Sequence, residues 1–145
     1  MIYLIGSLRN PKIPALAAKL RAAGYEVFDD WFAAGPEADD YWRDYEQGRG
    51  HSLSQALVGH AAQHVFQFDK YHLDRCDAAV LVLPAGRSGH LELGYVIGSG
   101  KKGYIIIDGE PERFDVMYAF ATAVVSSVEE LICELDKVQS NISQR

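Results

Sequence analysis

Residues 78–94 read Ala-Ala-Val-Leu-Val-Leu-Pro-Ala-Gly-Arg-Ser-Gly-His-Leu-Glu-Leu-Gly, and this stretch decides the fold class. Its first six residues form a continuous apolar run, which is typical of a strand buried on both faces of a sheet. A glycine-containing loop over residues 84–89 follows, and residues 90–98 have the pattern of a helix. A buried strand that leads directly into a helix indicates a βα unit of a parallel sheet.

The same alternation extends toward both ends of the chain. Apolar runs at residues 2–5, 25–28 and 103–107 predict three further strands, and residues 121–125 predict a short fifth one. The pattern therefore predicts an α/β fold, an open parallel sheet of four to five strands with interleaved helices. We expect one domain over residues 1–138 and a polar C-terminal tail over 139–145. The expected helices are 11–23, 37–47, 52–75, 90–98 and 128–138.

The composition excludes several functional classes. The chain has 145 residues, 48% hydrophobic and 23% charged, with a net charge of −6, which disfavours binding to a nucleic-acid polymer. No apolar run approaches the length that a membrane span requires, so we expect a cytoplasmic protein without membrane contact. Cys76 and Cys133 lack metal-type spacing, and we expect neither a metal nor a cofactor. His60 and His64 lie four residues apart, but residue 61 is Ala, so packing in the core or against a partner is the expected role of both histidines.

The loop after the first strand is a candidate anion site. The carboxyl ends of parallel strands meet at one edge of a sheet, so loops 6–11, 29–35 and 84–89 are expected to lie together. Gly6, Ser7 and Arg9 lead into a helix N-terminus, where free N–H groups favour a phosphate or carboxylate. The alternative is an ordinary turn with a surface arginine. Residues 1–25 carry four basic and no acidic side chains, whereas residues 26–48 carry eight acidic and one basic.

Two carboxylates are candidates for catalysis. Glu92 falls just inside a predicted helix, where the helix dipole would keep it ionised and suited to act as a nucleophile, although a purely dipolar role is the alternative. Asp69 lies among aromatic residues in the predicted helix 52–75 and is an acid/base candidate, with a surface ion pair as the alternative. Gly89 would allow a ligand close to the backbone, and Trp31 is the best candidate for a wall over a base.

Three stretches together resemble the nucleoside 2-deoxyribosyltransferase family. They are Tyr3-Leu4-Ile5-Gly6-Ser7-Leu8-Arg9, Asp69 ahead of the strand start Asp77-Ala78-Ala79-Val80, and Ser88-Gly89-His90-Leu91-Glu92-Leu93-Gly94-Tyr95 with Gly100-Lys101 behind it. The similarity runs in order over about residues 2–118. It implies a flavodoxin-like (Rossmann-like) fold with helices on both faces of the sheet. It also implies a homo-oligomer, at least a dimer, whose active sites are shared between subunits.

The resemblance implies N-glycosidic chemistry on 2′-deoxynucleosides, with a small nucleoside or nucleotide and a free nucleobase as substrates. Glu92 falls at the family's nucleophile, which forms a covalent deoxyribosyl intermediate before the sugar passes to a second base. Asp69 falls where the family binds and protonates the base, and Tyr3 where it contacts the sugar and steadies the nucleophile. Asp115 and Met117 resemble a stretch that reaches the neighbouring subunit's site and holds the 5′ end of the sugar.

Alternative activities remain open at this point. The Gly6-Ser7-Leu8-Arg9 loop looks more like the related 2′-deoxynucleoside 5′-phosphate N-hydrolases, in which such a loop and a serine hold the 5′-phosphate, and Ser88 is near the position of that serine. Gly86 and Asp115 replace an Asp and an Asn of the transferases. The alternatives are thus a 5′-monophosphate N-glycosidase that transfers the sugar to water, a non-catalytic nucleotide-binding module, and an NAD-cleaving enzyme.

Overall fold

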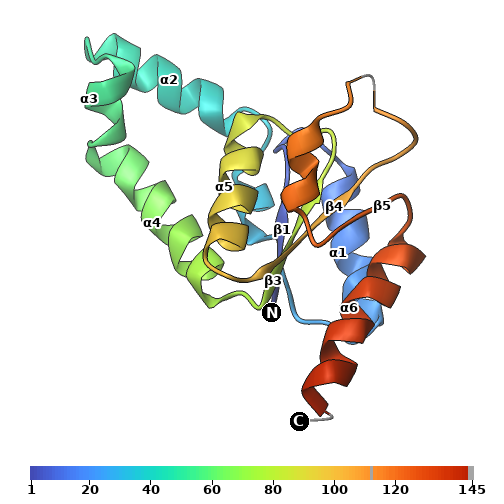
Figure 1. Cartoon of the computed structure of the whole chain (residues 1–145). Helices are drawn as coiled ribbons and strands as arrows, with labels where there is room; N and C mark the ends of the chain where they lie inside the picture. The colour runs from blue at the N-terminus through green and yellow to red at the C-terminus, as the bar shows by residue number, and fades with distance from the viewer. Residues whose placement is uncertain (112, 144–145) are drawn as a thin grey trace.

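A five-stranded parallel sheet forms the centre of the molecule (Figure 1). The computed structural model describes residues 1–111 and 113–143. The strand order is β2-β1-β3-β4-β5, and every neighbouring pair is parallel, which confirms the predicted flavodoxin-like α/β fold. The strands are β1 (Ile2–Ile5), β2 (Val27–Phe28), β3 (Ala78–Val82), β4 (Lys102–Ile106) and β5 (Ala123–Val125).

Helices cover both faces of the sheet, as the resemblance implied. On one face Leu4 and Val80 pack with apolar residues of α1 and α6, and on the other Tyr3 and Leu81 pack against α5 and the end of α4. The α2, α3 and α4 helices form an arm that projects from this second face (Figure 1). The helices are α1 (Lys12–Ala22), α2 (Ala38–Gly48), α3 (Leu53–Leu57), α4 (His60–Arg75), α5 (Arg87–Gly98) and α6 (Val128–Ser143), with 3₁₀ helices η1 (Asp30–Ala34) and η2 (Val116–Phe120).

The single helix predicted over residues 52–75 is wrong, because the chain breaks it at Gly59. Ser52 and Gln55 form a reciprocal capping box that starts α3, and Gly59 then takes an extended conformation that caps α4. A Cβ atom at Gly59 would lie 3.2 Å from the carbonyl oxygen of Ala56, which is a tight contact. Glycine therefore allows the sharp corner that separates α3 from α4 and shapes the arm.

The helix that carries Glu92 begins earlier than predicted. Gly86 is the N-cap of α5, so the helix starts at Arg87 rather than at residue 90. Gly89 explains this placement, since a Cβ atom there would lie 3.1 Å from side-chain atoms of both Ile5 and Leu81. The absence of a side chain lets the first turn of α5 lie directly on β1 and β3. Glu92 consequently lies in the second turn of the helix.

The C-terminal helix is longer than predicted. It continues to Ser143, because Leu131 and Leu135 are buried against the sheet and the helix hydrogen bonding extends beyond them. The helix end predicted near residue 138 is therefore wrong, because residues 139–143 continue the helix; residues 144–145 lie outside the described residues. Within the described residues, no helix is both long and apolar enough to cross a membrane.

Candidate active site

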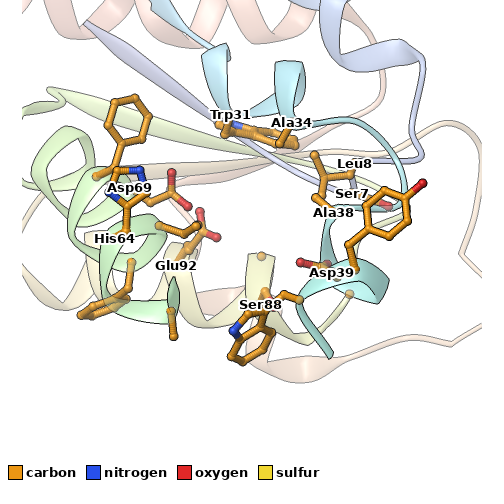
Figure 2. Close-up of a pocket in the computed structure, with 18 of the residues that line it drawn as sticks. Ser7, Leu8, Trp31, Ala34, Ala38, Asp39, His64, Asp69, Ser88 and Glu92 are labelled. Atoms are coloured by element: carbon orange, nitrogen blue, oxygen red, sulfur yellow. The ribbon is translucent and has the colours of Figure 1, made fainter. Parts of the chain in front are cut away.

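A cavity of about 1210 Å³ lies at the carboxyl ends of β1, β2 and β3 (Figure 2). The three loops that follow these strands all contribute to its lining, as their topology predicted. The helical arm supplies the opposite wall, through α2 and α4. Figure 2 shows Asp69 and His64 toward one end, Glu92 between the ends, and Ser7 and Asp39 toward the other.

Glu92 lies on α5 with its carboxyl group largely buried at the cavity. Burial and the neighbouring charge of Asp69 raise its pKa from 4.5 to about 7, while a hydrogen bond from the Tyr3 hydroxyl lowers it. The expectation that the helix dipole keeps Glu92 ionised is wrong. The side chain is one turn beyond the helix start, where the dipole is weak, and desolvation dominates. Near neutral pH the carboxyl group exchanges its proton readily.

Asp69 extends from α4 into the same cavity. Burial raises its pKa, and the neighbouring His72 opposes this shift. The alternative of a surface ion pair with Lys70 is wrong, because Lys70 bonds to Asp74 at 2.7 Å, one turn further along α4. Asp69 is therefore left available to the cavity, and it forms an electrostatically coupled pair of carboxylates with Glu92.

Tyr3 on β1 lies beneath this pair. The residue is fully buried, and its ring packs on Phe28 with 5.1 Å between ring centroids. Burial, followed by the charges of Glu92 and Asp69, raises the pKa of the phenol well above its ordinary value. The hydroxyl group therefore remains protonated and serves as a hydrogen-bond donor to Glu92.

The first loop lines the cavity but differs from the expected free anion site. The Ser7 hydroxyl accepts a hydrogen bond from the backbone N–H of Arg9 at 3.1 Å. Arg9 itself is engaged, because its guanidinium donates to Asp40 at 2.7 Å and to the Pro36 carbonyl at 3.2 Å. Gly6 serves packing, since a Cβ atom there would lie 2.7 Å from the Ile13 side chain.

Trp31 and Ser88 lie where the sequence predicted them, at the cavity. The indole N–H of Trp31 donates to the Leu4 carbonyl at 2.8 Å, which holds the ring against the sheet edge. Ser88 and Gly89, both in the first turn of α5, line the opposite side. The arm adds five aromatic lining residues: Tyr41, Trp42, Tyr45, Phe66 and Phe68.

His64 and Asp40 are among the cavity residues that the sequence did not single out. Packing of His60 and His64 in the core of the chain is wrong, because both are exposed, and His64 lies beside Asp69 and Glu92 in Figure 2. His60 is not among the described lining residues. His64 and Asp69 are five residues apart on α4, which is not the spacing of a shared helix face, and nothing local marks Asp40 as the partner of Arg9.

Asp115 and Met117 lie outside the described lining of this chain's own cavity. Asp115 caps η2 by accepting a hydrogen bond from the Met117 N–H at 2.9 Å, and Met117 is 60% exposed. The η2 segment is tied to the site through Tyr118, whose hydroxyl lies 2.8 Å from Nε2 of His90 on α5. Neither residue therefore contacts the cavity from within the same chain.

Comparison with known proteins extends this description at the level of the fold. No protein-family model and no curated protein sequence matches the chain. Among solved structures, the chain is similar to a CMP N-glycosidase of Clostridium botulinum, BcmB, with a TM-score of 0.56 and 13% sequence identity. The similarity covers 94% of this chain and 99% of that one, so the two share their architecture over nearly the full length.

Proposed function

We propose that the chain is an enzyme that cleaves the N-glycosidic bond of nucleosides or nucleoside 5′-monophosphates through a glycosyl–Glu92 intermediate. One observation carries the proposal: Tyr3, Asp69 and Glu92 come from three different elements and meet in one cavity, where burial raises the pKa of Glu92 to about 7. The fold shared with a protein described as a CMP N-glycosidase supports the same class of reaction.

In the first step, the ionised Glu92 attacks the anomeric carbon while the bond to the base nitrogen breaks. The proton of Asp69 passes to the departing base, so the base leaves as a neutral molecule. Positive charge develops on the sugar in the transition state, and the adjacent Glu92 carboxylate stabilises it. The Tyr3 hydroxyl holds the carboxylate in position for attack.

The two carboxylates divide one proton between them. Each ionises less readily than in water because of burial, and the charge of Asp69 raises the pKa of Glu92 further. Such a pair titrates as a unit, with one proton held near neutral pH. When the sugar gains positive charge, the negative charge is favoured on Glu92 and the proton on Asp69, which is the arrangement that the first step requires.

The acceptor in the second step distinguishes the two candidate activities. A second nucleobase would take the sugar from Glu92 in a transferase, and the sequence resemblance supports this outcome. Water would take it in a hydrolase, and the description of the similar structure supports that outcome. In both cases the acceptor attacks the anomeric carbon, the ester bond to Glu92 breaks, and the acceptor's proton passes to Asp69.

The test is base release from nucleosides, from their 5′-monophosphates and from NAD, with and without a second free base. We expect Glu92→Gln to lower kcat by about 10³-fold or more, because the amide cannot form the ester. Glu129→Gln, which alters an exposed glutamate of α6, is the matched control and should retain full activity. Full activity of Glu92→Gln would refute the proposed nucleophile.

The same assay separates the remaining alternatives. Products that appear only with the added base identify a transferase, and release into water alone identifies a hydrolase. Tight binding of a nucleotide without any turnover would instead support a binding module. Release of nicotinamide from NAD, with no reaction of the other substrates, would support an NAD-cleaving enzyme.

We also propose that the active protein is a homo-oligomer. Asp115 and Met117 lie outside this chain's cavity, so a contact of either residue with a sugar requires a second copy. The η2 segment presents Phe120, which is 71% exposed, and the arm presents a second apolar surface. Two exposed apolar surfaces on one chain are typical of an interface between copies. The arm's exposed apolar residues include Leu53, Val58, Val65 and Phe66.

A further inference from the structure

The cavity has two chemically different ends, which sets how a nucleoside can lie in it. Figure 2 shows Asp69 at one end, Glu92 between, and Ser7 with Asp39 toward the other end. In the proposed reaction the base lies at Asp69 and the anomeric carbon at Glu92. The 5′ end of the sugar then points toward the end that Ser7, Ser88 and Asp39 line.

The cavity is lined by three aspartates, Asp30, Asp39 and Asp40. Figure 2 places Asp39 at the end of Ser7, and Asp40 is bonded to Arg9 of the same loop, so this end carries negative charge. Among the described lining residues, Arg9 is the one lysine or arginine that could balance them. Whether this end of the cavity attracts or repels an anion therefore depends on whether the Arg9 guanidinium is free to bind a ligand.

Asp40 occupies Arg9. The guanidinium donates to the Asp40 carboxylate at 2.7 Å and to the Pro36 carbonyl at 3.2 Å, so two of its donor groups are already directed at α2 and the chain before it. Asp40 is held from its other side by Arg43 at 3.5 Å. The two side chains are 64% and 41% exposed, so water screens part of the attraction, but the bond directs the guanidinium of Arg9 at Asp40 rather than at a ligand in the cavity.

A 5′-phosphate and a 5′-hydroxyl would interact with these charged side chains very differently. A phosphate monoester carries nearly two negative charges at neutral pH. It must therefore face Asp39 and Asp40, or else displace Asp40 from Arg9 and leave that carboxylate without its partner. A 5′-hydroxyl carries no charge and can donate a hydrogen bond to the Asp39 carboxylate.

On the basis of the proposed function, we propose that Asp40 is a specificity-determining residue that occupies Arg9 and makes the cavity select a 5′-hydroxyl over a 5′-phosphate. The substrate class is then the free nucleoside. The discrimination comes from the carboxylate that blocks Arg9, together with the like charge of Asp39. Both contributions are electrostatic, so added salt weakens the preference.

The test compares kcat/KM for each of the four common 2′-deoxynucleosides with that for its 5′-monophosphate. At low ionic strength we expect the wild-type chain to prefer the nucleoside by at least about tenfold, and the preference to shrink in high salt. Asp40→Asn frees Arg9 and should move the ratio at least about tenfold toward the monophosphate. In the Arg9→Gln/Asp40→Asn double variant this gain should disappear, because no cation remains to bind the phosphate.

Asp44→Asn is the matched control. Asp44 lies on the same helix and pairs with Arg43 at 3.0 Å rather than with Arg9, so the variant loses the same charge without freeing Arg9. Its substrate ratio should equal that of the wild-type chain. Circular dichroism and thermal unfolding verify that both α2 variants fold. A wild-type preference for the monophosphate, or equal ratios in Asp40→Asn and Asp44→Asn, would overturn the proposal.

A binding measurement separates this proposal from the proposed function. If neither substrate releases its base, the proposed function fails, and calorimetric titration of the wild-type chain with the same ligands still decides the role of Asp40. Tighter binding of the nucleoside than of the monophosphate supports the proposal, provided that Asp40→Asn reverses the order. Tighter binding of the monophosphate by the wild-type chain overturns it.

Discussion

Burial of the Glu92 carboxyl group makes the stability of the chain depend on pH. The pKa rises from 4.5 to about 7, so the folded protein holds a proton that the unfolded chain releases at lower pH. The stabilisation from this proton is fully present below about pH 4.5 and is lost as the pH rises through about 7. The full loss corresponds to about 3 kcal/mol in the free energy of unfolding.

Glu92→Gln should remove this pH dependence, because the amide keeps the shape of the side chain and never ionises. We expect the variant to unfold with nearly wild-type stability at low pH, near 4.5. Above neutral pH it should exceed the wild-type chain by about 3 kcal/mol. For a chain of this size the gain corresponds to a rise in Tm on the order of 10 °C.

Urea unfolding followed by circular dichroism, repeated from acid to mildly alkaline pH, measures the effect. Glu129→Gln is the control, because this glutamate is exposed and its substitution should shift stability by a nearly constant amount at every pH. The reasoning is refuted if the difference between Glu92→Gln and the wild-type chain is the same at both ends of the range. In that case the carboxyl group would be ionising as it does in water.

Three further predictions concern catalysis and assembly. First, kcat/KM should fall about tenfold per pH unit above about pH 7, because the pair of carboxylates then loses its last proton, which the departing base requires, and Asp69→Asn should remove this alkaline fall; an unchanged alkaline fall would contradict the sharing of one proton by the two carboxylates. Second, His64→Asn should raise KM several-fold in steady-state assays, and His60→Asn on the same helix should not; equal effects would argue against His64 as a cavity residue. Third, Phe120→Asp should lower the molar mass measured by light scattering, because it charges the exposed η2 surface; an unchanged mass would place the interface elsewhere.

The strands and the edge that carries the site could be predicted from the sequence because their signals are local. The apolar runs of β1 and β3 contain no alternating polar residues that could face solvent, and both strands are fully buried in the sheet. The parallel arrangement then brings the following loops to one edge. Tyr3, Asp69 and Glu92 were singled out by residue type and resemblance, and the structure brings all three into one cavity.

Local sequence patterns were insufficient to predict the structure where distant parts of the chain come into contact. The corner at Gly59 interrupts a stretch whose helical periodicity continues on both sides, so periodicity alone could not show that an arm folds over the cavity. The start of α5 at Arg87 depends on contacts of Gly89 with β1 and β3. His64 lines the cavity because the arm places α4 there, and no local sequence pattern indicates this position.

The sequence by itself determined the order of strands and helices, the edge where the loops gather and the residue types available there, since each follows from neighbouring residues. Only the tertiary structure decided the state of those residues. Glu92 is held partly protonated rather than ionised, because its pKa depends on what excludes water from it. Arg9 is occupied rather than free, because its partner Asp40 is 31 residues away along the chain. Desolvation and ion pairing act through space, so they arise only when the chain has folded.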